Sequence, residues 1–231
     1  MISIIVPVLN EAQRLQSFLA ELKRVVASEA IAVEIIVVDG GSSDTTAQIA
    51  QTANAHVIAS PRGRAAQMNA GAAVALGEHL LFLHADTQLP VGFAGAIKTA
   101  CGANLAAWGR FDVTIEGKSK ALKIVAAMMR WRSRATGVAT GDQALFMHRN
   151  LFAQAGGFPA IALMEDIAFC KLAKKISAPI CLRQRVVTSG RRWQQRGVLR
   201  TIMQMWWLRL AYFFGAAPDK LHQQYYGKQR S

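Results

Sequence analysis

The chain has 231 residues, 52% of them hydrophobic, so it can bury a sizeable core and is too apolar to be disordered as a whole. Its formal net charge of +13 is uneven: the first 115 residues carry 7 basic and 9 acidic side chains, whereas the remaining 116 carry 20 and 5. A basic second half indicates an anionic partner, which charge alone leaves open among nucleic acid, a phosphorylated substrate and lipid headgroups.

Three cysteines, Cys101, Cys170 and Cys181, are widely spaced and form no C-x-x-C pair. This spacing argues against a disulfide framework and a zinc site, and it fits a reducing cytosol. The N-terminus leads directly into an apolar run without a basic segment, so we predict no signal peptide and a cytoplasmic location. We expect one domain, because single α/β domains of this length are common.

The first 84 residues alternate between short apolar runs and stretches with helical periodicity. The β-branched run at 2–9 predicts a strand, and apolar residues at helical spacing predict a helix at 12–27. The same pattern then predicts strands at 33–38, 55–59 and 80–84 and helices at 45–53 and 65–76. This β-α-β-α-β-α-β order predicts an α/β fold with a mostly parallel, right-handed wound sheet covered by helices.

After Pro90 the alternation becomes less regular. A glycine-punctuated segment at 137–147 separates the remaining predicted elements. These are helices at 93–101, 118–133, from about 150, 165–175 and 197–215, and strands at 106–113 and 180–187.

Carboxylates follow two of the predicted strands. Asp39 ends the strand at 33–38, and Asp86 follows the apolar run at 80–83. Because the carboxyl ends of parallel strands lie along one edge of a sheet, we expect both side chains in one crevice. Asp39 can accept hydrogen bonds from a base and a ribose, or it can cap the turn before Ser42. Asp86 can bind a divalent cation, or it can simply begin a turn.

These turns together resemble the successive signatures of the family 2 glycosyltransferases. The resemblance covers about residues 2–193. It rests on 4–11, 36–44 and 82–86, followed in the family's order by 141–144, 146–149, 156–158 and 165–166. The resemblance implies a GT-A type (Rossmann-like) fold, a nucleoside-diphosphate sugar as donor and a divalent metal, Mg²⁺ or Mn²⁺.

The resemblance also assigns roles to residues of the donor site. Asp39 would meet the base, Arg64 would approach the base or the diphosphate, and Asp86 would bind the metal that bridges the diphosphate. The same resemblance places in the nucleotide-sugar pocket Pro7, Asn10, Glu11, Gly141, Asp142, Arg192 and Trp193. For Arg192 and Trp193, a solvated basic loop with one packed tryptophan fits the sequence equally well.

The chain departs from the family at His84-Ala85-Asp86, where an Asp-x-Asp motif is usual. One carboxylate suffices for Mg²⁺ when phosphates and waters complete its octahedron. His84 could ligate Mn²⁺, but its apolar setting favours a buried histidine with a hydrogen-bond partner.

Asp166, next to Glu165, is the predicted catalytic base. Inverting transfer requires a carboxylate that takes the proton of the acceptor hydroxyl as this hydroxyl attacks the anomeric carbon. Cationic groups and the metal would stabilise the leaving nucleoside diphosphate. Glu165 and Asp166 could instead be acids at a helix N-terminus, which are favourable to the helix dipole.

The last predicted helix, within 198–215, is amphipathic. Most of its aromatic side chains gather on one side, and on the other side lie Arg200, Thr201, Gln204 and Tyr212. Arg200 and Arg209 interrupt the apolar run, so it does not reach the roughly 20 residues of a membrane span. An apolar face flanked by Arg and Trp suits a helix in a bilayer interface, whereas a core helix or a homodimer contact fits the same pattern.

The combined prediction is an inverting glycosyltransferase whose hydroxyl acceptor is lipid-linked or presented at the inner face of the cell membrane. Residues 1–90 form its nucleotide-binding half, 91–195 its acceptor and catalytic half, and 196–231 an amphipathic helix and tail. Three alternatives remain: a nucleotidyltransferase, a donor-binding protein without catalysis, and a basic nucleic-acid-binding module. We expect no nucleic-acid partner, because none of the usual motifs occurs.

Overall fold

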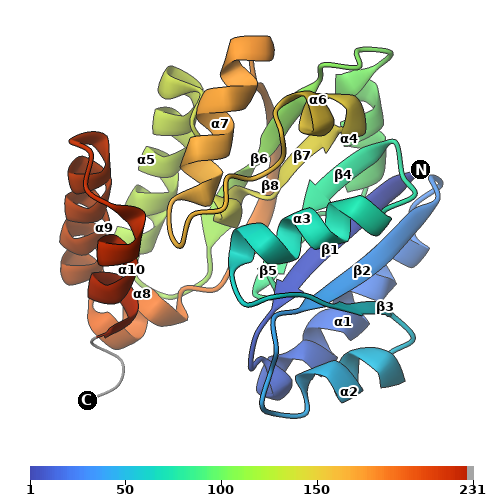
Figure 1. Ribbon diagram of the computed structural model, residues 1–231, viewed down its shortest axis with the longest axis horizontal. Coiled ribbons are helices and arrows are strands. Elements are labelled where there is room, and N and C mark those ends of the chain that lie inside the picture. Colours follow the sequence, from blue (N-terminus) through green and yellow to red (C-terminus); the bar gives the residue numbers. More distant parts are fainter. Residues whose placement is uncertain (228–231) are drawn as a thin grey trace.

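One eight-stranded sheet runs through the molecule (Figure 1). The computed structural model describes residues 1–227, apart from the side chains of Arg192, Arg196 and Tyr226. Its strands are β1 (Ile2–Val8), β2 (Val33–Asp39), β3 (His56–Ala59), β4 (His79–Phe82), β5 (Thr87–Gln88), β6 (Trp108–Ile115), β7 (Leu145–His148) and β8 (Ile180–Thr188). Their order across the sheet is β3-β2-β1-β4-β7-β6-β8-β5.

Helices cover both faces of this sheet (Figure 1). They are α1 (Ala12–Ala27), α2 (Thr46–Thr52), α3 (Arg64–Val74), α4 (Phe93–Cys101), α5 (Lys120–Thr136), α6 (Arg149–Gln154), α7 (Glu165–Ile176), α8 (Arg191–Arg196), α9 (Val198–Phe213) and α10 (Pro218–Tyr226). A short 3-10 turn, η1 (Gly141–Gln143), precedes β7.

The sheet changes direction at its middle. Strands β3, β2, β1 and β4 are parallel, as the sequence predicts for the first half of the chain. Strand β7 then pairs antiparallel with both β4 and β6, β8 is parallel to β6, and β5 closes the edge antiparallel to β8. The α/β class is confirmed, and the sheet is parallel in its first half and mixed in its second.

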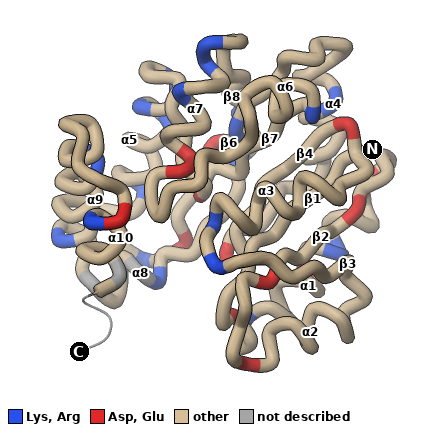
Figure 2. The backbone as a smooth tube through the Cα atoms, viewed as in Figure 1, with Lys and Arg blue, Asp and Glu red and all other residues tan. Residues whose placement is uncertain are grey.

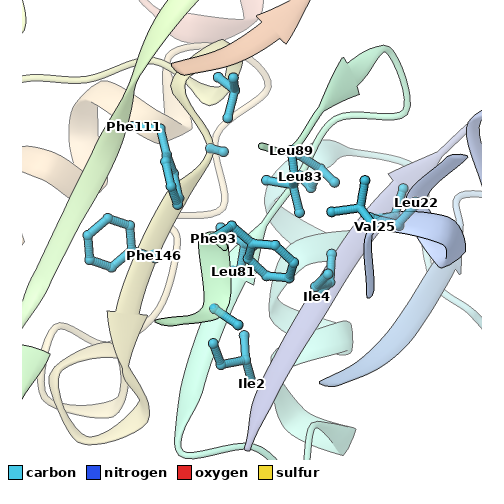
Figure 3. Packing of buried hydrophobic residues seen from close by; sticks show 14 of the residues in the cluster. Ile2, Ile4, Leu22, Val25, Leu81, Leu83, Leu89, Phe93, Phe111 and Phe146 are labelled. Atoms are coloured by element: carbon cyan, nitrogen blue, oxygen red, sulfur yellow. The ribbon is translucent and has the colours of Figure 1, made fainter. Parts of the chain in front are cut away.

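Alternating side chains of β1 build the core on both faces of the sheet. Ile4 and Val6 contact the cluster that α1 and α4 cover, together with residues such as Leu22 and Phe93 (Figure 3). Ile5 points to the opposite face, toward the cluster under α3, α6 and α7. Because both faces are covered, the first strands are apolar almost throughout.

A buried amide holds the ends of β1 and β2 together. Gln67 of α3 is only 3% exposed, and its Nε2 donates to the carbonyls of Val8 at 2.7 Å and Val38 at 2.8 Å. Glycine at position 40 leaves room for this amide, because a Cβ there would lie 2.9 Å from Cδ of Gln67 and would displace it. This network fixes the sheet edge at which Asp39 ends β2.

A buried ion-pair cluster attaches α5 to β6. Asp112 accepts hydrogen bonds from two guanidinium nitrogens of Arg134, at 2.8 and 2.9 Å, and it also pairs with Arg110. Arg110 is 1% exposed and Asp112 is 6% exposed, so the two charges compensate each other away from solvent.

The C-terminal helices pack on the second half of the sheet. Leu208 of α9 and Leu221 of α10 bury against Leu163 and Ile167 at the start of α7. Val198 and Ile202 of α9 pack on α5. In the described part of the chain, 1–227, no helix combines the length and the apolar character needed to cross a bilayer.

The predicted helices and strands occur in the structure, with ends that differ by up to a few residues. Within residues 1–227, five elements were not predicted: the 3-10 turn η1, the short strands β5 and β7, and the helices α8 and α10. Strand β7 has 4 residues and lies within the glycine-punctuated segment, where periodicity has too few positions to be seen. Helix α10 has a visible signal, a proline at its first position and Leu221 and Tyr225 one turn apart.

Candidate active site

A cleft of about 840 Å³ opens where β1 and β4 end, between α3 on one side and α7, α9 and α10 on the other. Most of the residues predicted to form the site line this cleft. They are Pro7, Glu11, Arg64, Asp86, Gly141, Asp142, Glu165, Asp166 and Trp193. Acidic and basic positions both occur around this edge of the molecule (Figure 2).

Asn10 and Asp39, which were predicted to bind the nucleotide sugar, accept hydrogen bonds that hold the loops beside the cleft. Asp39 accepts from the backbone N–H of Ser42 at 3.1 Å and from its hydroxyl at 2.5 Å, which is the turn-capping role. Asn10 has a left-handed φ of 54°, and its Oδ1 accepts from the Ser43 N–H at 2.9 Å. Neither belongs to the cleft lining. Their contact with a base remains a prediction.

The side chain of Arg192 lies outside the described side chains, so its predicted role stays a prediction. Its neighbour Trp193 lines the cleft and packs against the apolar cluster between α5 and α9.

Asp166 is held by two backbone N–H groups. The Gly141 N–H donates to its Oδ2 at 2.9 Å, and the Ile167 N–H donates to its Oδ1 at 2.7 Å. The preceding Met164 has a left-handed φ of 71°, an unfavourable conformation for this residue that turns the chain into α7 at the cleft. The base predicted from the sequence is therefore oriented from two separate segments, η1 and α7.

Burial raises the pKa of both acids at the start of α7. Glu165 is 4% exposed, and its pKa is raised first by burial and then by the negative charge of Asp166. Burial also raises the pKa of Asp166, against the lowering effect of the two N–H donors and of the Arg64 charge. Two adjacent carboxyl groups with raised pKa values in a cleft are typical of acid–base sites.

His84 lies next to an acidic side chain and is 18% exposed, and its predicted hydrogen bond stays a prediction. Its Nδ1 lies 3.4 Å from Oδ1 of Asp142. Its ring also lies against Gly141, where a Cβ would come within 2.3 Å of the His84 Nε2. The residue that replaces the usual first aspartate therefore contacts the loop that holds Asp166.

Asp86 and Glu11 are two carboxylates on the donor side of the cleft whose chemistry fits a divalent cation. The pKa of Glu11 is raised first by burial and then by the charge of Asp86, so the two carboxylates lie within each other's field. Both offer hard oxygen ligands. Among residues 1–227, no group of three or more His, Cys, Asp and Glu side chains gathers as a complete site. A cation here would take its other ligands from substrate and water.

Sequence reasoning missed the side of the cleft that the C-terminal helices form. Its residues come from the end of the second half of the chain: Met205, Leu208, Arg209, His222, Gln223 and Tyr225. The unpredicted α10 supplies His222 and Tyr225. Thr140, 8% exposed, also lines the cleft.

The sequence matches the family profile described as glycosyl transferase family 2 over residues 3–148. A search of the curated proteins found no match to this sequence.

The fold is similar to those of several solved glycosyltransferases at low sequence identity. One is the mannosyltransferase PcManGT from Pyrobaculum calidifontis, in complex with GDP-Man and Mn²⁺, with a TM-score of 0.63 and 18% identity over 97% of this chain and 69% of that one. TarS of S. aureus, in complex with UDP-GlcNAc, gives a TM-score of 0.60 and 18% identity over 81% of this chain. This chain spans only 58% of the crystallised TarS chain.

A third similar fold is mannosyl-3-phosphoglycerate synthase from Rubrobacter xylanophilus, with a TM-score of 0.56 and 15% identity over 85% of this chain and 75% of that one. At these identities the likeness establishes the fold, which is that of the GT-A glycosyltransferases. The family profile covers more than half of the sequence. The chain therefore belongs to glycosyl transferase family 2.

Proposed function

We propose that this enzyme transfers a sugar, with inversion, from a nucleoside-diphosphate sugar to an acceptor hydroxyl, with Asp166 as general base. The observation that carries the proposal is the position of this carboxylate, in the cleft and oriented by two backbone N–H groups. Each of its oxygens accepts one of these bonds and keeps a second lone pair for an incoming hydroxyl. Burial raises the pKa of Asp166, which makes its carboxylate a stronger base than that of an exposed aspartate.

In the proposed reaction, the acceptor oxygen forms a bond to the anomeric carbon as the bond from this carbon to the diphosphate oxygen breaks on the opposite face. The proton of the acceptor hydroxyl moves to Asp166. Glu165 is buried beside it, and its own pKa is raised by burial and by the charge of Asp166. The nucleoside diphosphate then leaves with the electron pair of the broken bond.

The donor half, residues 1–90, would bind the nucleotide along the ends of β1, β2 and β4. Asp39 would meet the base, and Pro7, Asn10 and Glu11 would line the pocket beside it. Arg64 begins the 11-residue helix α3, whose N-terminus favours an anion. Its guanidinium can bind a phosphate with two parallel hydrogen bonds.

A divalent cation, Mg²⁺ or Mn²⁺, would be held by Asp86, with Glu11 nearby, and would neutralise charge on the leaving diphosphate. The structures of PcManGT with GDP-Man and Mn²⁺ and of TarS with UDP-GlcNAc support such a donor. Residues 91–195 would bind the acceptor, with Gly141, Asp142, Arg192 and Trp193 near the transferred sugar. We place the enzyme in the cytoplasm, because its three cysteines are free and suit a reducing compartment.

Replacement Asp166→Asn tests the base. We expect transfer to fall by about 10²–10⁴-fold, because this is what a positioned general base contributes. Nucleoside-diphosphate binding should stay within about 2-fold, since Asp166 contacts the acceptor in this mechanism. Loss of binding with unchanged transfer per bound donor would refute the assignment. Release of pyrophosphate in place of nucleoside diphosphate would identify a nucleotidyltransferase.

Thermal-shift screening identifies the donor. Sugars linked to UDP, GDP, dTDP and CDP are compared, each with Mg²⁺, with Mn²⁺ and with a chelator. The bound donor raises the apparent melting temperature, because it stabilises only the folded state. We expect the shift to shrink with the chelator and in an Asp86→Asn variant. A chelator-independent shift would remove the metal from the proposal.

A further inference from the structure

Helix α9 is apolar on two opposite faces. Its inner face buries Thr201 and Leu208 and contributes Met205 and Arg209 to the cleft. Its outer face carries seven large apolar side chains, each between 52% and 77% exposed: Leu199, Met203, Trp206, Trp207, Leu210, Phe213 and Phe214. They recur at the three- and four-residue spacing of one helical face. The aromatic side predicted from the sequence thus points away from the protein.

The neighbouring helix α5 repeats this arrangement. Its inner residues, including Leu122 and Val125, pack with Val198 and Ile202 of α9, and the two helices lie side by side (Figure 1). On the side of α5 opposite these contacts, Ile124 is 61% exposed, Met128 47% and Trp131 73%. Single exposed apolar residues are ordinary, but large apolar side chains gathered on two packed helices mark an interaction surface.

The charge around this surface is of one sign. Residues 117–141, which contain α5, hold six basic and no acidic side chains. Residues 167–218, which contain α9, hold ten basic and no acidic side chains. Lys and Arg positions are spread over α5, α7 and α8, and acidic positions are few on this side (Figure 2). Lys118, Lys120 and Lys123 at the start of α5 and Arg200 on α9 are exposed.

Exposed apolar side chains surrounded by basic charge fit some classes of partner better than others. A second copy of the chain would bring two basic surfaces together, which is unfavourable. Nucleic acid would use the cations and stack bases on aromatic rings, but it would leave the exposed leucine, isoleucine and methionine side chains in water. A bilayer with anionic headgroups accepts both, because apolar side chains enter the acyl boundary while Lys and Arg remain at the headgroups.

We propose that the outer faces of α9 and α5 form a surface that binds anionic lipid bilayers, with α9 lying in the plane of the interface. At 1.5 Å per residue, its 16 residues extend over about 24 Å of membrane. Trp206 and Trp207 occupy the headgroup level, where the amphipathic indole is most stable.

The surface also suggests the class of acceptor, and this step rests on the proposed function. The inner face of α9 lines the catalytic cleft, so the cleft opens about one helix diameter, roughly 10 Å, from the bilayer. An acceptor hydroxyl on a membrane lipid would reach the cleft without leaving the membrane. We therefore assign a lipid-borne acceptor to the side of the cleft formed by α9 and α10.

Vesicle flotation of the full chain tests the surface. We expect the protein to float with vesicles of phosphatidylcholine and phosphatidylserine, more weakly with phosphatidylcholine alone, and less as salt rises. The variant Trp206→Gln/Leu210→Gln/Phe213→Gln should bind at least about 100-fold more weakly, because three large apolar side chains no longer enter the bilayer.

The matched control is Leu76→Gln/Val91→Gln/Leu105→Gln, which changes three other exposed apolar side chains and should float like the wild type. Unchanged nucleoside-diphosphate thermal shifts verify that both variants fold. Equal flotation of the α9 variant and the wild type would overturn the proposal. The proposal would also be overturned if the wild type floated with neither kind of vesicle and light scattering showed a wild-type dimer that the α9 variant does not form.

The variant Asp166→Asn separates this proposal from the catalytic one. It should float like the wild type, because Asp166 lies in the cleft and away from the outer face of α9. If the wild type floats but Asp166→Asn transfers sugar at the wild-type rate, the catalytic mechanism alone is refuted. If Asp166→Asn loses transfer but the wild type does not float, the membrane surface alone is refuted.

Discussion

The two halves of the sheet differ in the polar groups that they bury. The first half, β3-β2-β1-β4, is held at its active edge by the neutral amide of Gln67, and its ion pair Glu21–Arg24 lies on the surface of α1. The second half buries Arg110 with Asp112 and, at the cleft, Glu165. In residues 1–227, Nε and Nη2 of Arg132 are also buried without a hydrogen-bond partner. The donor half buries one carboxylate, Asp39, which Ser42 caps, whereas the catalytic half buries several charges at a cost in stability.

Among the changes that test this contrast, Asp112→Ala in the second half should lower stability the most. The change leaves Arg110 buried without its counter-charge, so the free energy of unfolding should fall by about 3–5 kcal/mol. Urea unfolding measures it. In the first half, Glu21→Ala removes the exposed partner of Arg24 and should leave the unfolding midpoint unchanged. Equal effects of the two changes would abolish the contrast.

Gly141→Ala tests the contact between the two halves, where Gly141 lies against the His84 ring. The new Cβ would fall 2.3 Å from Nε2 of His84, which displaces either the ring or the loop that orients Asp166. We expect transfer to fall by about 100-fold, because a misplacement near 1 Å can cost this much. Adding His84→Ala should restore part of the rate. Gly95→Ala in α4, where a Cβ has no contact within 4 Å, is the control.

Gln67→Ala tests the neutral network of the donor half. The carbonyls of Val8 and Val38 would lose their buried donor, so unfolding should become easier by about 1–3 kcal/mol. Thermal or urea unfolding measures the change, and the exposed Gln48→Ala serves as its control. A loss no larger than that of the control would show that water satisfies these carbonyls.

The smallest expected effect is the pH dependence that Glu165 gives to stability. Its pKa is raised in the folded protein, so the folded state binds this proton more tightly than the unfolded state does. Wild-type stability should therefore fall as pH rises from about 4.3, the ordinary value for glutamate, through the raised folded value. Glu165→Gln removes this loss and should stabilise the protein at neutral pH by about 1.4 kcal/mol for each pKa unit of the shift.

Below about pH 3 the glutamate is almost fully protonated in both states, so variant and wild type should converge there. Unfolding midpoints measured across this range test the sign. A variant that is less stable than the wild type at neutral pH would contradict the raised pKa.

The same contrast explains what could be predicted from the sequence. In the donor half, strands buried on both faces are apolar runs joined by helices with clear periodicity, so local patterns determine the elements. In the catalytic half, β7 has 4 residues and β5 has 2, and their pairing with strands distant in the sequence decides that they are strands.

The candidate site was predictable where chemistry follows a strand or opens a helix, as at Asp86 and Asp166. Both line the cleft, and so does Arg64. The contributions of Arg209 and His222 could not be read from the chain, because α9 and α10 reach the cleft only by folding back onto α7. The sequence of α9 showed an aromatic face and a more polar face, but tertiary packing decides which of them is exposed.

The hydrogen bond from Gly141 to Asp166 provides a spectroscopic readout of the base. Because the Gly141 amide donates directly to a carboxylate oxygen at 2.9 Å, its proton chemical shift depends on whether that oxygen is charged. Following this one resonance in an NMR titration would give the protonation state of Asp166 without an acceptor. Repeating the titration with donor bound would show how nucleotide binding changes the proton affinity of the base.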